Sequence, residues 1–136
     1  MPTQTLFRFF RQIKFILLNL TIGVVLIGCQ SDTQQMLPSF KVSEISGKVL
    51  SQEDLRGKVS IINFWATSCT TCVKEMPQMI ETYNKYKTDQ LEFIAIAMSY
   101  DPPMYVVNFA KTRQLPFKVA MDSDGSVAKA FGKIQL

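Results

Sequence analysis

The sequence predicts an α/β domain in which a central, mostly parallel sheet is flanked by helices. Segments rich in β-branched and aromatic residues alternate with segments of helical periodicity, the pattern of parallel strands joined by helices. Residues 59–65 and 91–98 are nearly continuous apolar runs, as expected for strands covered on both faces. The 136 residues fit one domain. We place it at residues 40–136, after a signal peptide at 1–28 and a tether at 29–39.

The elements before the first long strand are short. Residues 40–45 and 48–50 flank Ser46-Gly47, which predicts a small hairpin. Residues 51–54 (SQED) have capping-box spacing, so a short helical turn should begin here and end near Gly57.

A strand, a loop and a long helix follow. Val59–Trp65 is predicted to be a central strand, and residues 66–68 form a brief loop. The helix should run from Cys69 to about Lys87. Residues at helical spacing would face the sheet, namely Val73, Met76, Ile80 and Tyr83.

The rest of the chain continues the alternation. Leu91–Met98 is a buried strand, and Pro102-Pro103 opens a helix over 104–112, because proline is tolerated in a first turn. The last predicted elements are a strand at Phe117–Met121, a turn at 122–125 and a short helix at Ser126–Phe131.

The first 28 residues have the order of a secretory signal. Arg8, Arg11 and Lys14 precede an apolar run at 15–28, and no acidic residue occurs before Asp32. Fourteen helical residues span about 21 Å, whereas the hydrocarbon core of a bilayer is about 30 Å thick. The segment therefore predicts export, with an uncleaved anchor as the alternative.

Leu26-Ile27-Gly28-Cys29 resembles the lipobox of bacterial lipoproteins. The resemblance implies cleavage before Cys29 and lipidation of that cysteine. Gln30 follows it, where an aspartate would suggest retention at the inner membrane, so sorting to the outer membrane is compatible with the sequence. We expect a membrane-anchored lipoprotein that faces the periplasm.

Composition excludes several classes of function. The net charge of +4 falls to about +1 without the three N-terminal basic residues, so the folded part has no nucleic-acid footprint. Histidine is absent, which removes Cys-His and Ser-His-Asp centres and histidine metal ligands. The six glycines form no nucleotide-binding motif, and no cofactor or metal is expected.

Cys69 and Cys72 are the candidate reactive groups. They stand three residues apart where a strand gives way to a helix, so they can form a disulfide with little movement of the backbone. Unpaired N–H groups at the start of a helix favour a thiolate at Cys69, which makes it the expected nucleophile. Cys72 would then be the resolving thiol.

Other interpretations of the pair remain open. A zinc site would need further cysteine or histidine ligands, and a purely structural disulfide would close only a very short loop. Two ordinary buried cysteines are a third alternative, which an export signal disfavours.

The region around the cysteines resembles the thioredoxin superfamily. Residues 59–65 are followed by Ala66-Thr67-Ser68-Cys69-Thr70-Thr71-Cys72-Val73-Lys74-Glu75-Met76-Pro77, similar to the W-A-x-W/S-C-x-x-C-x-x-E-x-P pattern of the TlpA/ResA/DsbE-like group. Residues 93–97, 115–117 and 122–125 also look like this group. The resemblance extends from about Phe40 to the C-terminus and implies a thioredoxin-like fold.

The resemblance implies a reductant for disulfides in exported proteins, with an unknown membrane or periplasmic electron donor. Targets of related proteins include apocytochrome c and copper-site assembly factors. Trp65 matches a tryptophan beside the active site, or is a plain core aromatic. Glu75 matches a buried glutamate that relays a proton, or is a solvated residue on the helix face. Thr70, Thr71 and Pro77 would pack at the site, and the proline has a purely structural interpretation too.

Two departures from the family stand out. Thr71 replaces a proline common in relatives, at a position that influences the redox potential. The chain also stops at Leu136, before the segment in which relatives carry a cis-proline facing the cysteines, two antiparallel strands and a last helix. In relatives the first of those strands pairs with the equivalent of Val59–Trp65. We therefore expect an open edge there, and a protein of this length that is unstable or a fragment.

Two other functions compete with disulfide exchange. Thiol peroxidases share this fold but usually carry threonine three residues before the reactive cysteine, where this chain has Ala66. A non-enzymatic role, as a metallochaperone or an inactive lipoprotein, is the other alternative. Copper chaperones of related fold use a wider cysteine spacing plus a histidine, and neither is seen here.

Overall fold

The computed structural model describes residues 36–88, 90–132 and 134. The predicted signal peptide, Cys29 and most of the tether lie outside the described residues. The elements are β1 (Lys41–Glu44), β2 (Val49–Ser51), the 3-10 turn η1 (Gln52–Leu55), β3 (Val59–Trp65), α2 (Thr70–Tyr86), β4 (Leu91–Ala97), α3 (Pro103–Thr112), β5 (Lys118–Met121) and α4 (Ser126–Ala130). None of the described helices is long and apolar enough to cross a membrane.

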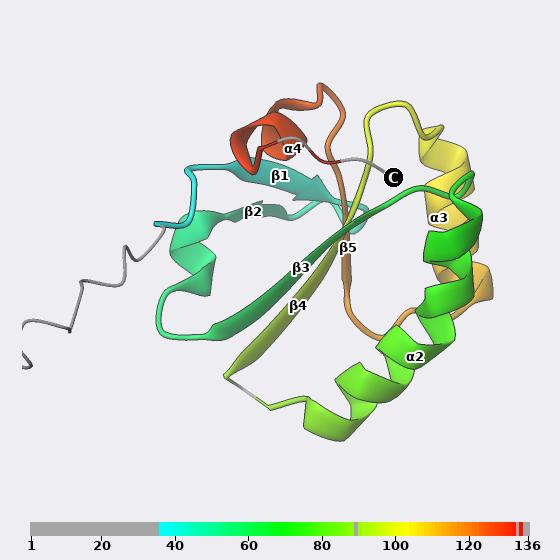
Figure 1. Cartoon of the computed structure of the whole chain (residues 1–136), viewed down its shortest axis with the longest axis horizontal. Coiled ribbons are helices and arrows are strands. Elements are labelled where there is room, and N and C mark those ends of the chain that lie inside the picture. The colour runs from blue at the N-terminus through cyan, green and yellow to red at the C-terminus, as the bar shows by residue number, and fades with distance from the viewer. Residues whose placement is uncertain (1–35, 89, 133, 135–136) are drawn as a thin grey trace, which may run out of the picture. The chain divides into compact units, whose positions relative to one another are not determined.

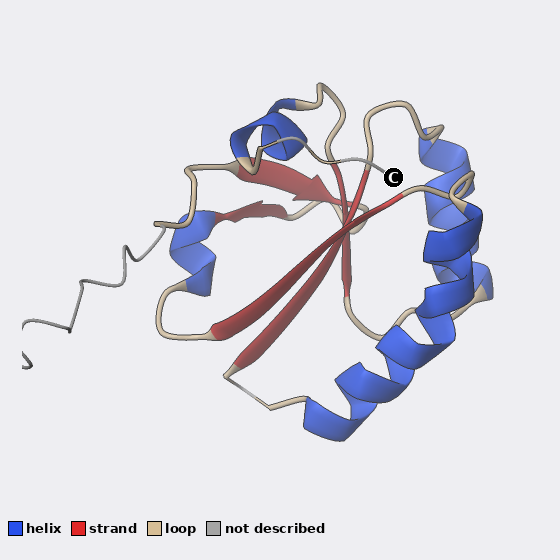
Figure 2. Cartoon of the chain, viewed as in Figure 1, coloured by secondary structure: helices blue, strands red, loops and turns tan. Residues whose placement is uncertain are grey.

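The five strands form one mixed sheet with the order β2-β1-β5-β4-β3 (Figures 1 and 2). β3, β4 and β5 are parallel, as the alternation of strands and helices predicted. β1 pairs antiparallel with both β2 and β5. The predicted α/β class is therefore confirmed, with the N-terminal hairpin adding an antiparallel side to the sheet.

The side chains of β4 alternate between two cores, one on each face of the sheet. Phe93, Ala95 and Ala97 point toward the face covered by α2 and α3. Ile94 and Ile96 point toward the other face, where α4 and η1 pack. Figure 1 shows α2 and α3 on one side of the sheet and α4 on the other. Alternate residues of one strand thus hold both layers of helices.

The helix that follows the cysteines packs on the core through three of the four residues that the periodicity predicted; Val73 is not among the residues that contact this cluster. Met76 is 1% exposed in the core, and Ile80 and Tyr83 pack against the same cluster. Tyr83 makes edge-to-face contacts with Phe93 and Phe117, whose rings stack with centroids 4.6 Å apart. These aromatic contacts hold the C-terminal part of α2 against β4.

The hairpin turn and the capping box that were predicted before β3 are both confirmed. The hairpin turn contains Gly47 at φ 91°, a conformation that glycine adopts without a steric penalty. The capping box is present, because Ser51 donates its N–H to Asp54 Oδ2 at 2.8 Å and the Ser51 side chain also contacts this carboxylate.

The prediction that β3 is a central strand covered on both faces is wrong for the described residues. The central strand is β4, in which only the first residue is not buried. β3 pairs with β4 alone among the described strands, and Val59 and Ile61 are 69% and 38% exposed. An apolar run reports how hydrophobic a strand is, but not how many strands lie beside it. The open edge expected for β3 is seen in the described part of the sheet.

One ion-pair cluster ties the N-terminal ends of the parallel strands together. Glu92 at the start of β4 has a side chain only 11% exposed, and its carboxylate contacts Lys118 Nζ at 2.7 Å and Lys58 Nζ at 3.2 Å. Burial raises the pKa of Glu92, but the hydrogen bonds from Lys118 and Lys58 and their positive charges outweigh it and hold this pKa below its usual value. The cluster lies at the end of the sheet opposite the cysteines.

The lowered pKa of Glu92 predicts a pH-dependent contribution to stability. Because the pKa is lower in the folded than in the unfolded chain, the contribution is present above the unfolded value and is lost as pH falls through the folded value. We expect Glu92→Gln to lower the free energy of unfolding by about 1–2 kcal/mol at pH 7. In urea titrations this difference should shrink below the ordinary glutamate pKa of 4.5. Glu81→Gln, on the exposed side of α2, is the matched control, and a difference for Glu92→Gln that does not change with pH would contradict the assignment.

Candidate active site

The two cysteines lie where the parallel strands end and α2 begins. β3 ends at Trp65, the chain turns through residues 66–68, and Cys69 is the N-cap residue of α2. The N–H of Cys69 donates to the carbonyl of Ala66 at 3.1 Å, which closes the turn. The carboxyl ends of parallel strands are where open α/β sheets place their reactive groups, so the site has the position that the sequence predicted.

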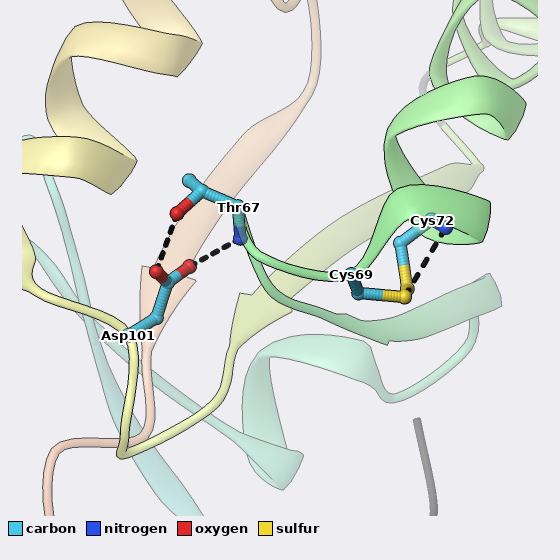
Figure 3. Close-up of a disulfide and its surroundings, with 4 residues drawn as sticks. All are labelled: Thr67, Cys69, Cys72 and Asp101. Atoms are coloured by element: carbon cyan, nitrogen blue, oxygen red, sulfur yellow. Dashed lines mark hydrogen bonds between the residues drawn. A yellow bond between two sulfur atoms is a disulfide. The ribbon is translucent and has the colours of Figure 1, made fainter.

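Cys69 and Cys72 form a disulfide with their Cα atoms 5.3 Å apart (Figure 3). The backbone N–H of Cys72 donates to Cys69 Sγ at 3.2 Å, so a sulfur atom takes the place of the oxygen that usually caps a helix. The N–H of Val73 donates to the carbonyl of Cys69 at 3.0 Å. Both cysteines are half-buried, and Cys72 packs against the core. The disulfide is therefore partly exposed at the surface, at the start of α2.

A buried carboxylate holds the loop in front of the cysteines. Asp101, in the loop between β4 and α3, is 2% exposed. Its two oxygens accept hydrogen bonds from the N–H of Thr67 at 2.6 Å and from Thr67 Oγ1 at 2.5 Å (Figure 3). The N–H of Met98 also donates to the carbonyl of Trp65 at 2.9 Å. The active-site loop is therefore fastened to the loop that follows β4.

Sequence reasoning missed Asp101, although a signal was present. The residue directly precedes Pro102-Pro103 and follows a buried strand, the position at which parallel strands bring their loops together. What the sequence does not give is the pairing of this loop with Thr67, because the two residues are 34 positions apart.

Trp65 is a core residue at the end of β3, directly before the active-site loop. It is 0% exposed, and its ring lies 5.1 Å from the ring of Phe109 on α3. Its indole N–H has no hydrogen-bond partner among the described residues. Trp65 is therefore both a core aromatic and a neighbour of the active site, because it immediately precedes the active-site loop.

The other predicted site residues lie on the first two turns of α2. Thr70 and Thr71 are exposed at its start, next to the disulfide. Pro77 is exposed inside α2, where it has no N–H to offer the carbonyl of Val73. Glu75 is also exposed, and it lines a hollow of about 280 Å³ together with residues of β3 and α2. The buried environment considered for Glu75 is not seen in the described residues, and its catalytic role stays a prediction.

The described residues hold no cluster of three or more histidine, cysteine, aspartate or glutamate side chains that could bind a metal ion.

The chemistry that the geometry of the cysteine pair supports is thiol–disulfide exchange. One sulfur stands at the N-terminus of a helix, and its partner is close enough to displace whatever it captures.

Comparisons with known proteins agree with this geometry. The model of the Redoxin family matches residues 31–136. The thiol-disulfide oxidoreductase ResA of Bacillus cereus is 38% identical over 133 residues, a match that covers 93% of this chain and 76% of that protein.

Solved structures give the same result. The thioredoxin-family thiol:disulfide interchange protein of Chlorobium tepidum superposes with a TM-score of 0.70 at 28% identity, over 79% of this chain and 76% of that one. DsbF of Mycobacterium tuberculosis, described in mixed oxidised and reduced forms, superposes with a TM-score of 0.64 at 28% identity, over 71% of each chain. The chain therefore belongs to the Redoxin family of the thioredoxin superfamily and is a thiol–disulfide oxidoreductase similar to ResA.

Proposed function

We propose that this protein reduces disulfides in exported proteins through the dithiol of Cys69 and Cys72. The observation that carries the proposal is the contact between the N–H of Cys72 and the sulfur of Cys69 at the start of α2. When the disulfide opens, this N–H and the positive end of the helix stabilise negative charge on Cys69 Sγ. The attacking form of the nucleophile is therefore favoured by the backbone itself.

The reaction consists of two displacements on sulfur. The Cys69 thiolate attacks one sulfur of the partner disulfide, forms a mixed disulfide and expels the other partner sulfur as a thiolate, which takes up a proton. Cys72 then loses its proton and attacks Cys69 Sγ, releasing the second partner thiolate, which is protonated in turn. Two electrons pass to the partner, and the Cys69–Cys72 disulfide remains on this protein, the state that the structure describes.

Glu75 is the group that we propose accepts the proton of Cys72 in the second displacement. It lies three residues further along α2, and so on a neighbouring position of the helix surface. Its carboxylate is exposed at the surface of α2, so a water molecule can carry the proton between the two side chains.

Asp101 and Thr67 are positioning residues in this proposal. They contact neither sulfur in the described hydrogen bonds, but they fix the loop that leads into Cys69. Exchange requires the first sulfur to stay at the mouth of α2 while its bond to Cys72 opens and closes. Because Asp101 bonds both the backbone N–H and the hydroxyl of Thr67, the loop keeps Cys69 at the start of α2 in the reduced state.

The predicted signal peptide at 1–28 and the lipobox-like Cys29 support a place of action for this proposal. They favour a lipid-anchored protein facing the periplasm, with the domain held at the membrane surface and the outer membrane as one destination. Disulfides persist in that compartment, and a reductant there needs a membrane or periplasmic electron donor.

Replacing the cysteines separately tests the order of attack. We expect the reduced Cys72→Ser variant to accumulate a mixed disulfide with a model peptide disulfide, because Cys69 can attack but nothing resolves the product. Cys69→Ser should form no such adduct and should lose reduction by at least about a hundredfold. Intact mass spectrometry of the quenched mixtures measures both results, and adducts that form equally in the two variants would contradict the assigned nucleophile.

Removing the Thr67 hydroxyl tests the loop contact. Thr67→Val keeps the shape of the side chain and leaves Asp101 with one donor fewer, so the reduced loop should be less ordered. We expect the second-order rate of disulfide reduction to fall about three- to tenfold and the redox potential of the pair to shift, at a temperature where circular dichroism shows full folding. Thr67→Ser keeps the hydroxyl and should restore both values. A Thr67→Val variant with unchanged rate and potential would remove the positioning role.

A further inference from the structure

An open hollow beside the redox site is used by no step described above. Its volume is about 490 Å³. We call it the α3 hollow, and it is lined by Thr67, Tyr105, Asn108, Phe109, Thr112 and Arg113. Four of these residues recur at the spacing of one helix face, so the hollow extends along one side of α3 from the active-site loop to the end of the helix.

The lining combines exposed aromatic surface with polar groups. Tyr105 is 62% exposed, and Phe109 is half-buried, with the Arg113 guanidinium 5.6 Å from the centre of its ring. Asn108 and Thr112 are exposed and offer hydrogen-bond donors and acceptors. Aromatic residues and arginine are enriched where proteins bind other proteins.

Three large side chains are exposed in the segment that leads into α3. Tyr100 and Met104 are 59% and 64% exposed, and with Tyr105 they stand within six consecutive residues. Asp101, in the same segment, fastens it to the active-site loop.

The hollow lies within reach of a polypeptide bound to Cys69. Thr67 precedes Cys69 by two residues, so their Cα atoms are separated by at most about 7.6 Å. An extended partner chain advances about 3.3 Å per residue. A side chain two or three positions from the partner's cysteine can therefore enter the hollow while its sulfur faces Cys69.

We propose that the α3 hollow binds the segment next to the partner's disulfide and favours an aromatic or large aliphatic side chain two or three residues from the reacting cysteine. Tyr105 and Phe109 provide the apolar contact, and Asn108 and Thr112 bond the partner's backbone. This binding holds the disulfide near Cys69 for longer and so speeds the first displacement. The inference deepens the proposed function and rests on it.

Two peptides and two variants test the proposal. The substrates are symmetric disulfide dimers of short peptides with a Gly-Cys-Gly core flanked on both sides by phenylalanine or, in the second peptide, by serine. The rate constant of each is measured with the reduced full-length protein in single turnover. We expect the wild type to favour the phenylalanine peptide about fivefold and Tyr105→Ser to lower this ratio to about one. Tyr86→Ser, the same change at a 56% exposed tyrosine at the far end of α2, should keep the wild-type ratio.

The possible results distinguish failure of the α3 hollow as a binding site from failure of the proposed disulfide reduction. Equal rates for the two peptides in the wild type, or a ratio that Tyr105→Ser leaves unchanged, would overturn the docking subsite while disulfide reduction stands. A ratio that falls as far in Tyr86→Ser would also overturn it, because the effect would then not depend on the hollow. A reduced wild type that transfers electrons to neither peptide would overturn the proposed function and the subsite together.

Discussion

The backbone N–H of Cys72 points at the sulfur of Cys69, and the chemistry of this protein depends on that contact. It exists because α2 begins one residue after Cys69, so a free N–H of its first turn, that of Cys72, meets a sulfur where an oxygen usually caps a helix. The helix can begin there because β3 ends at Trp65 and the chain needs only residues 66–68 to turn. The end of β3, a short loop and the N-terminus of α2 thus place the Cys69 sulfur where a free backbone N–H and the positive end of the helix dipole favour a thiolate.

β4 keeps this arrangement in place, although it carries no reactive group. Its alternate side chains form the cores on both faces of the sheet, and it pairs with β3 in register along the full length of both strands. The loop after β4 supplies Asp101, and the loop after β3 supplies Thr67. Because the two strands are parallel neighbours, both loops leave the sheet at the same end. The buried carboxylate then closes the short distance between them.

Much of this could be predicted from the sequence, because the signals were local. The capping box at Ser51, the proline pair at the start of α3 and the helical spacing of Met76, Ile80 and Tyr83 each depend on residues a few positions apart. The disulfide was predictable for the same reason, since its cysteines are three residues apart.

The remaining features depend on contacts between distant residues. The edge position of β3 is a property of strand order, which a run of apolar residues does not encode. The contact of Asp101 with Thr67 and the pairing of Glu92 with Lys58 and Lys118 join segments that meet only in the folded sheet. Glu75 illustrates the same limit, because its place on the helix was predictable but its exposure was not.

The most direct test of the account is the ionisation of Cys69 in the reduced protein. The rate of alkylation of this single thiol, followed from pH 4 to pH 10 in a Cys72→Ser background and in the unfolded chain, gives its apparent pKa in each state. The account predicts a value in the folded protein clearly below the roughly 8.5 of a free cysteine. A folded-state value equal to or above that of the unfolded chain would show that the start of α2 does not stabilise the thiolate, and would contradict the central claim.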